Sequence, residues 1–394
     1  MVEKGYLMYT WVLSLSGEIG TKQRATYQLF QKLVFQGLFS RLKSCGLDCS
    51  FEEKNHRFLL SSPQDLTPLL CSQFGVAKLA RLFRTTLDGH EATACPWDEV
   101  LPLRPFTYTV YVEGIYQRGL WTKALNIKRQ LLSFLRLKAQ EHLSFWDNHP
   151  PYHLDIRLIL PSPEECWLLI NPMRGPSGLP IGAGGKVLCL FSGGPDSLLA
   201  AYLLGRRGQE VELIFFDDQE PYRQEAVRQG ARKLAYFFPH QEIVLWQVPY
   251  AEALRYLAQR APKRDLCFLC KGLMFVLATD LARQNCSQAL ASGEILGEQA
   301  SQTISALPFY KSPLPILRPV ITFNKDEIFA KLKEIGLEKE AHRGLPPCSF
   351  VPKHPRTKPK ITPERAQSLI DQAKRLCPLP QKMVLSWGRR CLWK

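Results

Sequence analysis

The stretch Ser192–Ser197, SGGPDS, places small and turn-forming residues between an apolar run and a leucine- and alanine-rich run. Its glycines leave room for backbone N–H groups to approach an anion, because no side chain blocks them. Asp196 or Ser197 can begin the following helix, whose amino end attracts phosphate. The Walker pattern and the complete dinucleotide-binding pattern are both absent from the sequence. The stretch therefore predicts either a phosphate-binding loop or an ordinary glycine turn with a helix cap.

A pair of cysteines, Cys267 and Cys270, has the C-x-x-C spacing of metal ligands or of a redox pair. A structural zinc site needs four ligands, and the chain has no second C-x-x-C. Cys348 is a third candidate, because it lies in the loop-like stretch LPPCSFVP. Metal binding, thiol chemistry and a plain structural role are all open for these residues.

The formal charge of +15 over 394 residues favours a polyanionic partner such as RNA, DNA or anionic lipid. The sequence has no apolar run of the ~18–20 residues needed to span a bilayer, and the apolar stretch near its start lacks the pattern of a signal peptide. Twelve cysteines without a secretion signal predict reduced thiols in a cytoplasm. We therefore expect a cytoplasmic protein of two or three domains that does not contact a membrane.

The elements that must position these residues form two patterns on either side of Asn171–Gly185. Eight of the fifteen residues in that stretch are Gly or Pro, which indicates a linker. Before it, the sequence predicts two helices, near 23–43 and 122–141, and short strands near 11–15, 50–53, 57–60, 106–112, 154–159 and 167–170. After it, the runs VLCLF, VELIFFDD and IVLWQVP alternate with helical segments, which predicts a parallel sheet. Ligands of such sheets bind beyond the carboxyl ends of the strands, and SGGPDS lies at such an end.

The loop sequence SGGPDS resembles the SGGxDS loop of the PP-loop ATP pyrophosphatases, which adenylate a carbonyl or carboxyl oxygen and release pyrophosphate. Further segments resemble the tRNA 4-thiouridine synthetase family: CFLCKGLMFVLATDLA, ASGEILGEQASQT, PILRPVITFNKDEI and CSFVPKHPRTKPK. This resemblance extends over about 178–360. SGEIGTKQR and LLCSQFGVAKLARLF look similar to the start of that family's ferredoxin-like and THUMP domains.

The resemblance implies an α/β fold in which ferredoxin-like and THUMP α+β domains precede a PP-loop domain with a parallel sheet, of the HUP or adenine nucleotide alpha hydrolase-like type. The implied domains are a ferredoxin-like domain at 1–66, a THUMP RNA-binding domain at 67–172, a linker at 173–185, and a catalytic PP-loop domain with a basic tail at 186–394. The chain reaches Lys394 soon after Cys348, so we expect no rhodanese-like domain.

The resemblance also implies ATP contacts at matching positions. The implied ATP-binding residues are Leu190, Phe191, Ser192, Gly193, Gly194, Asp196, Ser197, Phe215, Phe216, Lys271, Gly293 and Gln302, and Asp196 is in addition an implied catalytic residue. Two departures from the family's pattern stand out. Pro195 replaces a usual aliphatic residue, which removes one N–H donor. Phe215-Phe216 replaces a frequent His-Phe, which puts polar contact to the base in doubt.

For sulfur chemistry, similarity to cluster-dependent members implies that Cys267, Cys270 and Cys348 are catalytic and hold a 4Fe–4S cluster. Three thiolates would leave one iron open to bind sulfide. The rival chemistry is a persulfide on one cysteine that another cysteine resolves as a disulfide. The implied sulfur donor is a cysteine desulfurase or free sulfide.

Clusters of basic residues predict contacts with tRNA, because cations neutralise phosphates. The candidates are Lys123, Lys128 and Arg129 in the predicted helix near 122–141, and Lys353, Arg356 and Lys358 in the acid-free stretch Pro352–Lys360. A THUMP-like domain implies docking of the tRNA acceptor end.

Taken together, the resemblance implies an ATP-dependent tRNA sulfurtransferase that uses Mg²⁺ and converts uridine 8 to 4-thiouridine, with AMP and pyrophosphate as products. Two other readings keep the ATP loop: thiolation of another tRNA base, and sulfur supply for the thiazole of thiamine. A catalytically inactive tRNA-binding protein is a third alternative. The expected partners are tRNA and the sulfur donor, and a homodimer stays open.

Overall fold

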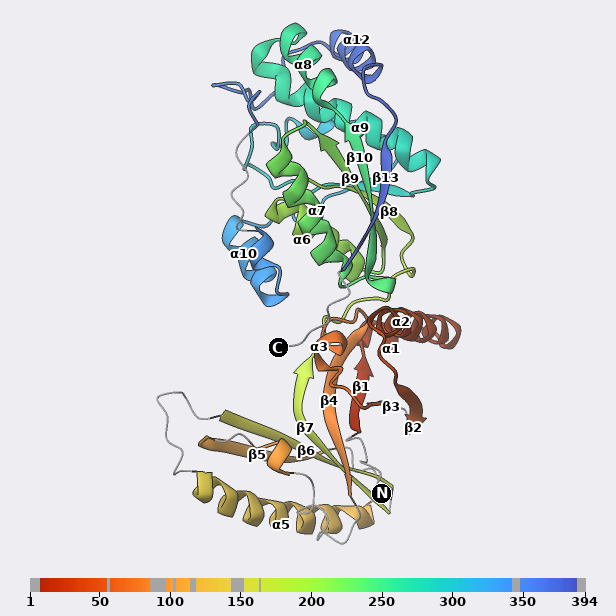
Figure 1. Cartoon of the computed structure of the whole chain (residues 1–394), viewed down its shortest axis with the longest axis vertical. Coiled ribbons are helices and arrows are strands. Elements are labelled where there is room, and N and C mark those ends of the chain that lie inside the picture. The colour runs from red at the N-terminus through yellow and green to blue at the C-terminus, as the bar shows by residue number, and fades with distance from the viewer. Residues whose placement is uncertain are drawn as a thin grey trace. The chain divides into compact units, whose positions relative to one another are not determined.

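The computed structural model describes residues 8–54, 57–85, 97–101, 104–113, 118–142, 152–162, 164–341 and 348–387. The chain divides into two compact units (Figure 1). The first unit consists of Met1–Thr21 and Gly46–Ser177, and the second of Lys22–Cys45 and Gly178–Lys394.

The first unit is built on one seven-stranded sheet with the order β2-β3-β1-β4-β7-β6-β5. β5 and β6 are parallel, and the other neighbouring pairs are antiparallel. The elements of this unit are β1 (Tyr9–Leu15), α1 (Gly17–Gly20), β2 (Ser50–Lys54), β3 (Arg57–Ser62), α3 (Thr67–Leu70), β4 (Val76–Thr85), η1 (Trp97–Glu99), β5 (Phe106–Glu113), α5 (Arg118–His142), β6 (Tyr152–Ser162) and β7 (Glu165–Arg174).

Helix α5 lies along part of this sheet (Figure 1) and packs one apolar face against it. Ala124, Ile127, Leu131 and Leu135 recur every three or four residues, as on one side of an α-helix, and all four are buried against side chains of β5, β6 and β7. The basic residues of the helix therefore lie on its other sides.

The second unit is built on a six-stranded sheet with the order β12-β11-β8-β9-β10-β13. Its elements are α2 (Arg24–Cys45), β8 (Lys186–Leu190), α6 (Pro195–Arg206), β9 (Glu210–Asp217), α7 (Pro221–Ala235), η2 (Pro239–Gln241), β10 (Glu242–Pro249), α8 (Ala251–Arg260), η3 (Lys263–Asp265), α9 (Leu266–Gln284), β11 (Ala289–Ala291), η4 (Leu307–Phe309), β12 (Ile316–Leu317), α10 (Lys325–Glu334), α11 (Glu338–Ala341), α12 (Pro363–Lys374) and β13 (Gln381–Ser386).

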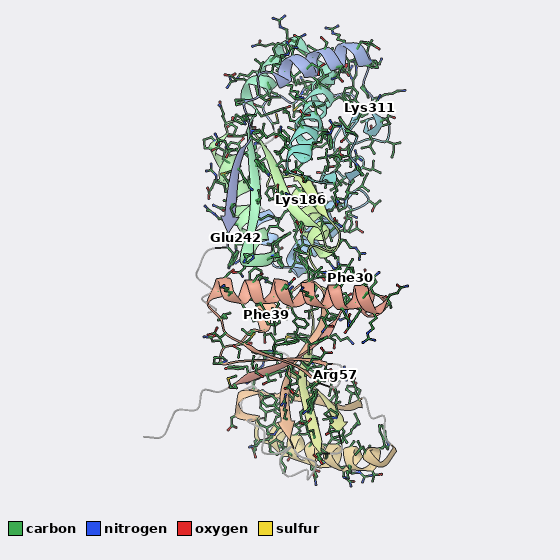
Figure 2. The ribbon with its side chains drawn as sticks, turned by 90° about the vertical axis from the view of Figure 1, so that its right-hand side faces the viewer. Phe30, Phe39, Arg57, Lys186, Glu242 and Lys311 are labelled. Carbon is green, nitrogen blue, oxygen red and sulfur yellow. The ribbon has the colours of Figure 1, made fainter. Side chains whose placement is uncertain are left out.

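All neighbouring strands of this sheet are parallel except β13, which pairs with β10 in the antiparallel direction. Lys186 and Glu242, the first residues of β8 and β10, lie at the same end of the sheet (Figure 2). The chain passes from β8 to β9 and β10 on one side, then returns to β11 on the other side of β8. Strand order therefore reverses at β8, which is where open α/β sheets bind ligands.

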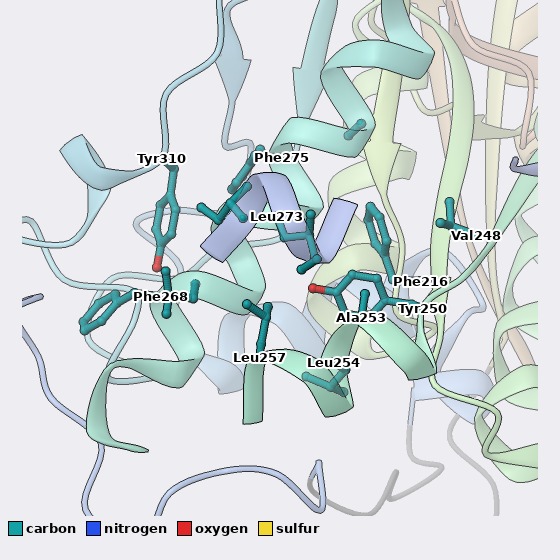
Figure 3. Close-up of a cluster of buried hydrophobic side chains, with 14 of the residues drawn as sticks. Phe216, Val248, Tyr250, Ala253, Leu254, Leu257, Phe268, Leu273, Phe275 and Tyr310 are labelled. Carbon is teal, nitrogen blue, oxygen red and sulfur yellow. The ribbon is translucent and has the colours of Figure 1, made fainter. Parts of the chain in front are cut away.

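A cluster of apolar side chains joins the strands of this sheet to α8, α9 and α12. Phe216 is near the end of β9, and its ring centroid lies 5.3 Å from that of Tyr250 in an edge-on arrangement (Figure 3). The helices contribute Leu254 and Leu257 from α8 and Leu273 from α9 to the same cluster (Figure 3). Within the described residues, no helix is long and apolar enough to cross a membrane.

The predicted fold class, a mixed α/β protein with a parallel sheet after the linker, is confirmed. The three predicted strands after the linker correspond to β8, β9 and β10. Helix α2 groups with the second unit: the Ser44 hydroxyl donates to the carbonyl of His240 at 2.9 Å, and the N–H of His240 donates to the Ser40 hydroxyl at 3.1 Å. The N-terminal strands form one sheet, and the boundaries at 66 and 172 stay predictions.

Candidate active site

A pocket of about 340 Å³ opens at the carboxyl ends of β8, β9, β10 and β11 in the second unit. It is lined by Leu190, Phe191, Ser192, Asp196, Ser197, Phe215, Phe216, Asp218, Arg223, Tyr250, Leu254, Leu266, Cys267, Cys270, Lys271, Met274, Ser292, Gly293, Glu294, Gln299, Ser301, Gln302, Cys348, Phe350 and Val351. Of the predicted ATP-binding residues, only the two glycines of SGGPDS are not in this lining, and both lie between lining residues of the same loop. The structure thus brings the predicted ATP-binding residues and the three predicted cysteines to one place.

The loop Ser192–Ser197 turns directly from β8 into α6. Gly193 has φ = +76°, a left-handed conformation that favours glycine, and a Cβ there would lie 3.0 Å from the backbone N of Val227. Gly194 is the N-cap of α6, and Pro195 is the first helical residue. The Ser197 hydroxyl donates to the Gly194 carbonyl at 3.0 Å, which closes the loop. The amino end of a twelve-residue helix therefore faces the pocket, as anion binding requires.

The carboxylate of Asp196 does not stand alone in this loop. The ammonium of Lys325 donates to both of its oxygens, at 2.7 and 2.8 Å, and also lies 2.7 Å from Glu298 Oε1. Burial raises the pKa of Asp196, although the hydrogen bond from Lys325 acts in the opposite direction. Lys325 begins α10, where Asn324 and Glu327 form a capping box that fixes the helix start.

A second charged group lies on the β11 side of the pocket and centres on Glu294. Its carboxylate accepts from Lys271 Nζ at 3.0 Å, from Arg318 Nε at 2.7 Å and from the Ser292 hydroxyl at 2.9 Å. Only 3% of Glu294 is exposed. Burial raises the pKa of Glu294, but Lys271 and Arg318 outweigh burial and hold the pKa below its ordinary value. Two cations face one carboxylate in this group, whereas one cation, Lys325, faces two carboxylates at the phosphate loop.

The opposite wall supplies apolar surface with unpaired polar atoms. Phe215 and Phe216 are both buried and line the pocket. Among the described residues, two acceptor atoms of the pocket lining are buried without a hydrogen-bond partner: Asp218 Oδ1, directly after β9, and Gln302 Oε1, in the segment after β11. Because a buried polar atom without a partner is costly, a ligand that donates hydrogen bonds fits this pocket. A nucleoside combines such donors with a flat apolar surface.

The three predicted sulfur residues come from two segments of the chain. Cys267 and Cys270 lie in the first two turns of α9, while Cys348 begins the last described segment, 348–387. None of the three is in a disulfide. The Tyr250 hydroxyl donates to the Cys270 carbonyl at 2.9 Å and lies 3.5 Å from its Sγ. Burial raises the pKa of Cys270 to about 12, against the effect of the Tyr250 hydrogen bond.

The three cysteine thiols could hold either a single metal ion or an iron–sulfur cluster. Within the described residues, no three His, Cys, Asp or Glu side chains are grouped to hold a single metal ion. An iron–sulfur cluster is wider than one ion, so its thiolates need not converge on one point, and thiolate is the ligand that such clusters use. Three free thiols that line one pocket therefore suit a cluster better than a mononuclear site.

The residues predicted to contact RNA occupy both units. In the first unit, Lys123 and Arg129 are exposed on α5, and Lys128 is partly exposed. In the second unit, Lys353 and Lys358 are exposed. Arg356 differs from them, because its guanidinium Nη1 lies 2.6 Å from Asp265 Oδ2 and its side chain is only 26% exposed.

Several polar residues of the site were not predicted from the sequence, namely Lys325, Glu294, Glu298, Asp218 and Tyr250. The pattern Asn324-x-x-Glu327 predicts a helix beginning at Lys325. It gives no sign that this lysine reaches Asp196, which lies 129 residues earlier in the chain. A signal was available for Glu294, because it belongs to the GEILGEQASQT stretch that also carries Gly293.

Comparison with known proteins assigns a family to this arrangement. The profile of the thiamine biosynthesis protein (ThiI) family matches residues 182–369. A probable tRNA sulfurtransferase of Macrococcus caseolyticus is 33% identical over 227 residues, which cover 56% of each of the two chains. One from a Thermoanaerobacter species is 34% identical over 292 residues, or 72% of each chain. The chain thus spans just over half of the first relative's length and nearly three quarters of the second's.

The fold has a counterpart among solved structures. A crystal structure of a 4-thiouridine synthetase–RNA complex with bound ATP matches 96% of this chain and 100% of that chain. The TM-score is 0.75 and the sequence identity is 23%, so this likeness concerns the fold. The Thermoanaerobacter relative, 34% identical over 72% of its length, shows that the chain belongs to the tRNA sulfurtransferase family.

Proposed function

We propose that this protein is an ATP-dependent tRNA sulfurtransferase that converts uridine 8 of tRNA to 4-thiouridine. The observation that carries the proposal is the shared pocket: a loop suited to phosphate, an apolar wall suited to a nucleoside and three free thiols line one cavity. The names of the relatives support the sulfur-transfer step. The solved 4-thiouridine synthetase contains ATP and RNA, which supports the same two ligands here.

ATP is proposed to bind with its phosphates at the amino end of α6 and its adenosine against Phe215 and Phe216. The glycines of the loop let backbone N–H groups approach the phosphates. Gln302 Oε1 and Asp218 Oδ1 can accept hydrogen bonds from the adenine amino group or a ribose hydroxyl. Leu190, Phe191 and Gly293 shape the walls between these two ends.

The reaction proposed for this site has two steps. In the first, O4 of the uracil attacks the α-phosphorus of ATP, an O–P bond forms, and pyrophosphate leaves with the electron pair of the bond that breaks. Loop N–H groups and the ammonium groups of Lys271 and Lys325 stabilise the charge that grows on the phosphates. Mg²⁺ enters with ATP as part of the substrate. In the second step, sulfide supplies the electron pair of a new bond to C4, the bond between C4 and O4 breaks, and AMP departs with O4 and that bond's electron pair.

The three cysteines are proposed to hold the group that delivers sulfur in the pocket. Cys267, Cys270 and Cys348 would hold a 4Fe–4S cluster, and such a cluster supplies an iron position at which sulfide can be kept. Leu266 and Met274, which belong to α9 like Cys267 and Cys270, add apolar surface to the pocket lining. We propose a cysteine desulfurase or free sulfide as the donor, and the cytoplasm, where reduced thiols persist, as the location.

Binding of tRNA is proposed to use exposed cations on both units. Lys123, Lys128 and Arg129 follow the sides of α5 that do not face the sheet. Lys353 and Lys358 lie on the segment that begins with Cys348 at the pocket. Their charges can neutralise phosphates of the same tRNA molecule whose uridine enters the pocket.

Pyrophosphate release and nucleoside analysis test this function together. The protein is purified anaerobically, its iron and sulfide are measured, and it is mixed with ATP, sulfide and unmodified tRNA. We expect tRNA-dependent pyrophosphate release and 4-thiouridine in the digested tRNA. Asp196→Ala should abolish both while leaving tRNA affinity intact, whereas Asp371→Ala, which removes an exposed carboxylate on α12, should change neither.

Several results would contradict parts of the proposal. Pyrophosphate release that persists in Asp196→Ala would exclude the proposed ATP site. Thiolation of another nucleoside would move the activity to a different base. Full thiolation by a protein that contains no iron would replace the cluster with persulfide chemistry on the same cysteines.

A further inference from the structure

The segment from Cys348 to Lys360 is tied to the residues that immediately precede α9. Asp265 is buried, with 1% of its surface exposed. Its carboxylate accepts from Arg356 Nη1 at 2.6 Å and from the backbone N–H of Lys360 at 3.3 Å. Two reciprocal contacts run beside this ion pair: the N–H of Arg356 donates to the Arg264 carbonyl at 3.1 Å, and Arg264 Nε donates to the His354 carbonyl at 2.9 Å.

Asp265 occupies a position at which an aspartate side chain ordinarily accepts a hydrogen bond from the backbone of its own helix. It is the N-cap of α9, and aspartate at an N-cap usually accepts a hydrogen bond from the second or third N–H of the helix. Its side chain makes no such bond here. The carboxylate instead faces Arg356, 91 residues further along the chain. A local capping role therefore does not account for this aspartate, and the long-range contact does.

Asp265 and Arg356 are both close in sequence to cysteines that line the pocket. Cys267 is two residues after Asp265, and Cys270 follows one helical turn later. On the other segment, Cys348, Phe350 and Val351 line the pocket before the chain reaches Arg356. Contacts at Asp265 and its neighbour Arg264 thus join the two cysteine-bearing segments, beside a hydrogen bond from the Thr303 hydroxyl to the Thr357 carbonyl at 2.6 Å and the packing of Cys348 and Phe350 against the apolar cluster.

We propose that Asp265 is a positioning residue whose ion pair with Arg356 holds the segment of Cys348 against the helix of Cys267 and Cys270. Arg356 consequently acts inside the protein, while Lys353 and Lys358 are left to contact tRNA phosphates. The link to sulfur transfer rests on the proposed function, but the structural claim about the three thiols does not.

Thiol accessibility tests the proposal without any need for catalysis. The metal-free, reduced full-length protein is treated with iodoacetamide, and the rate of alkylation at each cysteine is measured by peptide mass spectrometry. Asp265→Asn and Arg356→Gln should each raise the rate at Cys348 by about tenfold or more, because removing one partner of a buried ion pair is strongly destabilising. The double variant should be no worse than the more affected single variant, because the two residues act as one unit. Arg356→Lys, which keeps the charge, should restore part of the protection.

A tRNA-binding measurement separates this role from a phosphate contact. Arg356→Gln should leave the slope of log affinity against log salt unchanged, whereas the exposed control Lys358→Gln should reduce the slope by about one. In single-turnover thiolation, Arg356→Gln should lower the rate about as much as it exposes Cys348, and tRNA affinity should not change.

Three outcomes would overturn the proposal: an unchanged alkylation rate at Cys348 in Arg356→Gln, a change in Asp265→Asn that Arg356→Gln does not share, or a salt slope that falls by about one in Arg356→Gln. Cys189, buried in β8, reports whether a variant has unfolded as a whole. If Asp265→Asn exposes Cys189 as well, that variant has unfolded, and the alkylation rates of Cys348 in Arg356→Gln and Arg356→Lys are compared instead. Equal rates in these two variants would then overturn the proposal. Absence of thiolation in the parent protein would contradict the proposed function and leave the alkylation result valid.

Discussion

Substitution of Gly293 by alanine is expected to damage the phosphate loop from the neighbouring strand. Gly293 follows β11 in the pocket wall. A Cβ built on it would lie 2.6 Å from Ser197 N, 2.7 Å from the carbonyl carbon of Asp196 and 2.8 Å from its oxygen. These are backbone atoms in the first turn of α6, so they cannot move aside by changing a rotamer.

The size of the effect follows from these distances. Ordinary contact begins at 3.4 Å, so α6 and the segment after β11 must separate by about 0.8 Å. Overpacking of this kind costs about 1–3 kcal/mol of unfolding free energy. Because displacements near 1 Å can cost about a hundredfold in a binding or catalytic site, we expect ATP to bind roughly 10–100 times more weakly.

Calorimetric titration with ATP and thermal unfolding would measure both quantities on one preparation. Gly20→Ala is the control, because a Cβ there meets no atom within 4 Å. Gly293→Ala with the parent's unfolding temperature and ATP affinity would refute the steric argument. A variant that loses stability but keeps its ATP affinity would show that the strain is absorbed away from the loop.

Three further predictions concern charged groups of the site and its surroundings. Glu294→Gln should lower the unfolding free energy by roughly 1–3 kcal/mol, because three buried hydrogen bonds to a charged acceptor are weakened; chemical denaturation at pH 7 measures this loss. Since the pKa of Glu294 lies below its ordinary value, its contribution is complete above the unfolded pKa of about 4.3 and is lost as pH falls further, so the parent and Glu294→Gln should converge in stability in acid; a constant difference down to pH 3 would contradict this linkage. Lys325→Met should weaken ATP binding in a titration more than it lowers the unfolding temperature, because it leaves Asp196 and Glu298 without their shared cation, while the exposed helical substitution Lys331→Met should do neither. Affinity for tRNA should fall steeply with salt, with a slope of about −0.7 to −0.9 per neutralised phosphate, and a dissociation constant that does not change between low and moderate salt would remove the electrostatic account.

The sequence was sufficient to predict the loop and the sheet that carries it. Val187–Phe191 is an apolar run of strand length followed by glycines, and both features act over a few neighbouring residues. The contacts that complete the site act over long separations instead. Lys325 reaches Asp196, and Arg318 reaches Glu294, only because β11, β12 and α10 return to the side of β8 at which the strand order reverses. No local pattern contains that information.

The same limit applies to the basic stretch Pro352–Lys360. From the sequence, its lysines and Arg356 were equivalent candidates for RNA contact, because composition does not distinguish an exposed cation from a paired one. In the structure, the difference depends on Asp265, a residue far away in sequence whose carboxylate would need a cation wherever it was buried. A charge count therefore overestimates the cations available to tRNA.

Pro195 illustrates how a departure from a family pattern can be judged by its position. A proline in the middle of a helix would remove a hydrogen bond, but Pro195 is the first residue of α6, directly after the N-cap Gly194. N–H groups of the first turn have no acceptor inside the helix, so the proline leaves the helix intact and its fixed φ suits the helix start. The cost falls only on the anion site, which loses one of several N–H donors. Because Lys271 and Lys325 bring two ammonium groups to the same site, this loss does not argue for an inactive tRNA-binding protein, and ATP affinity measured on the parent protein separates the two readings.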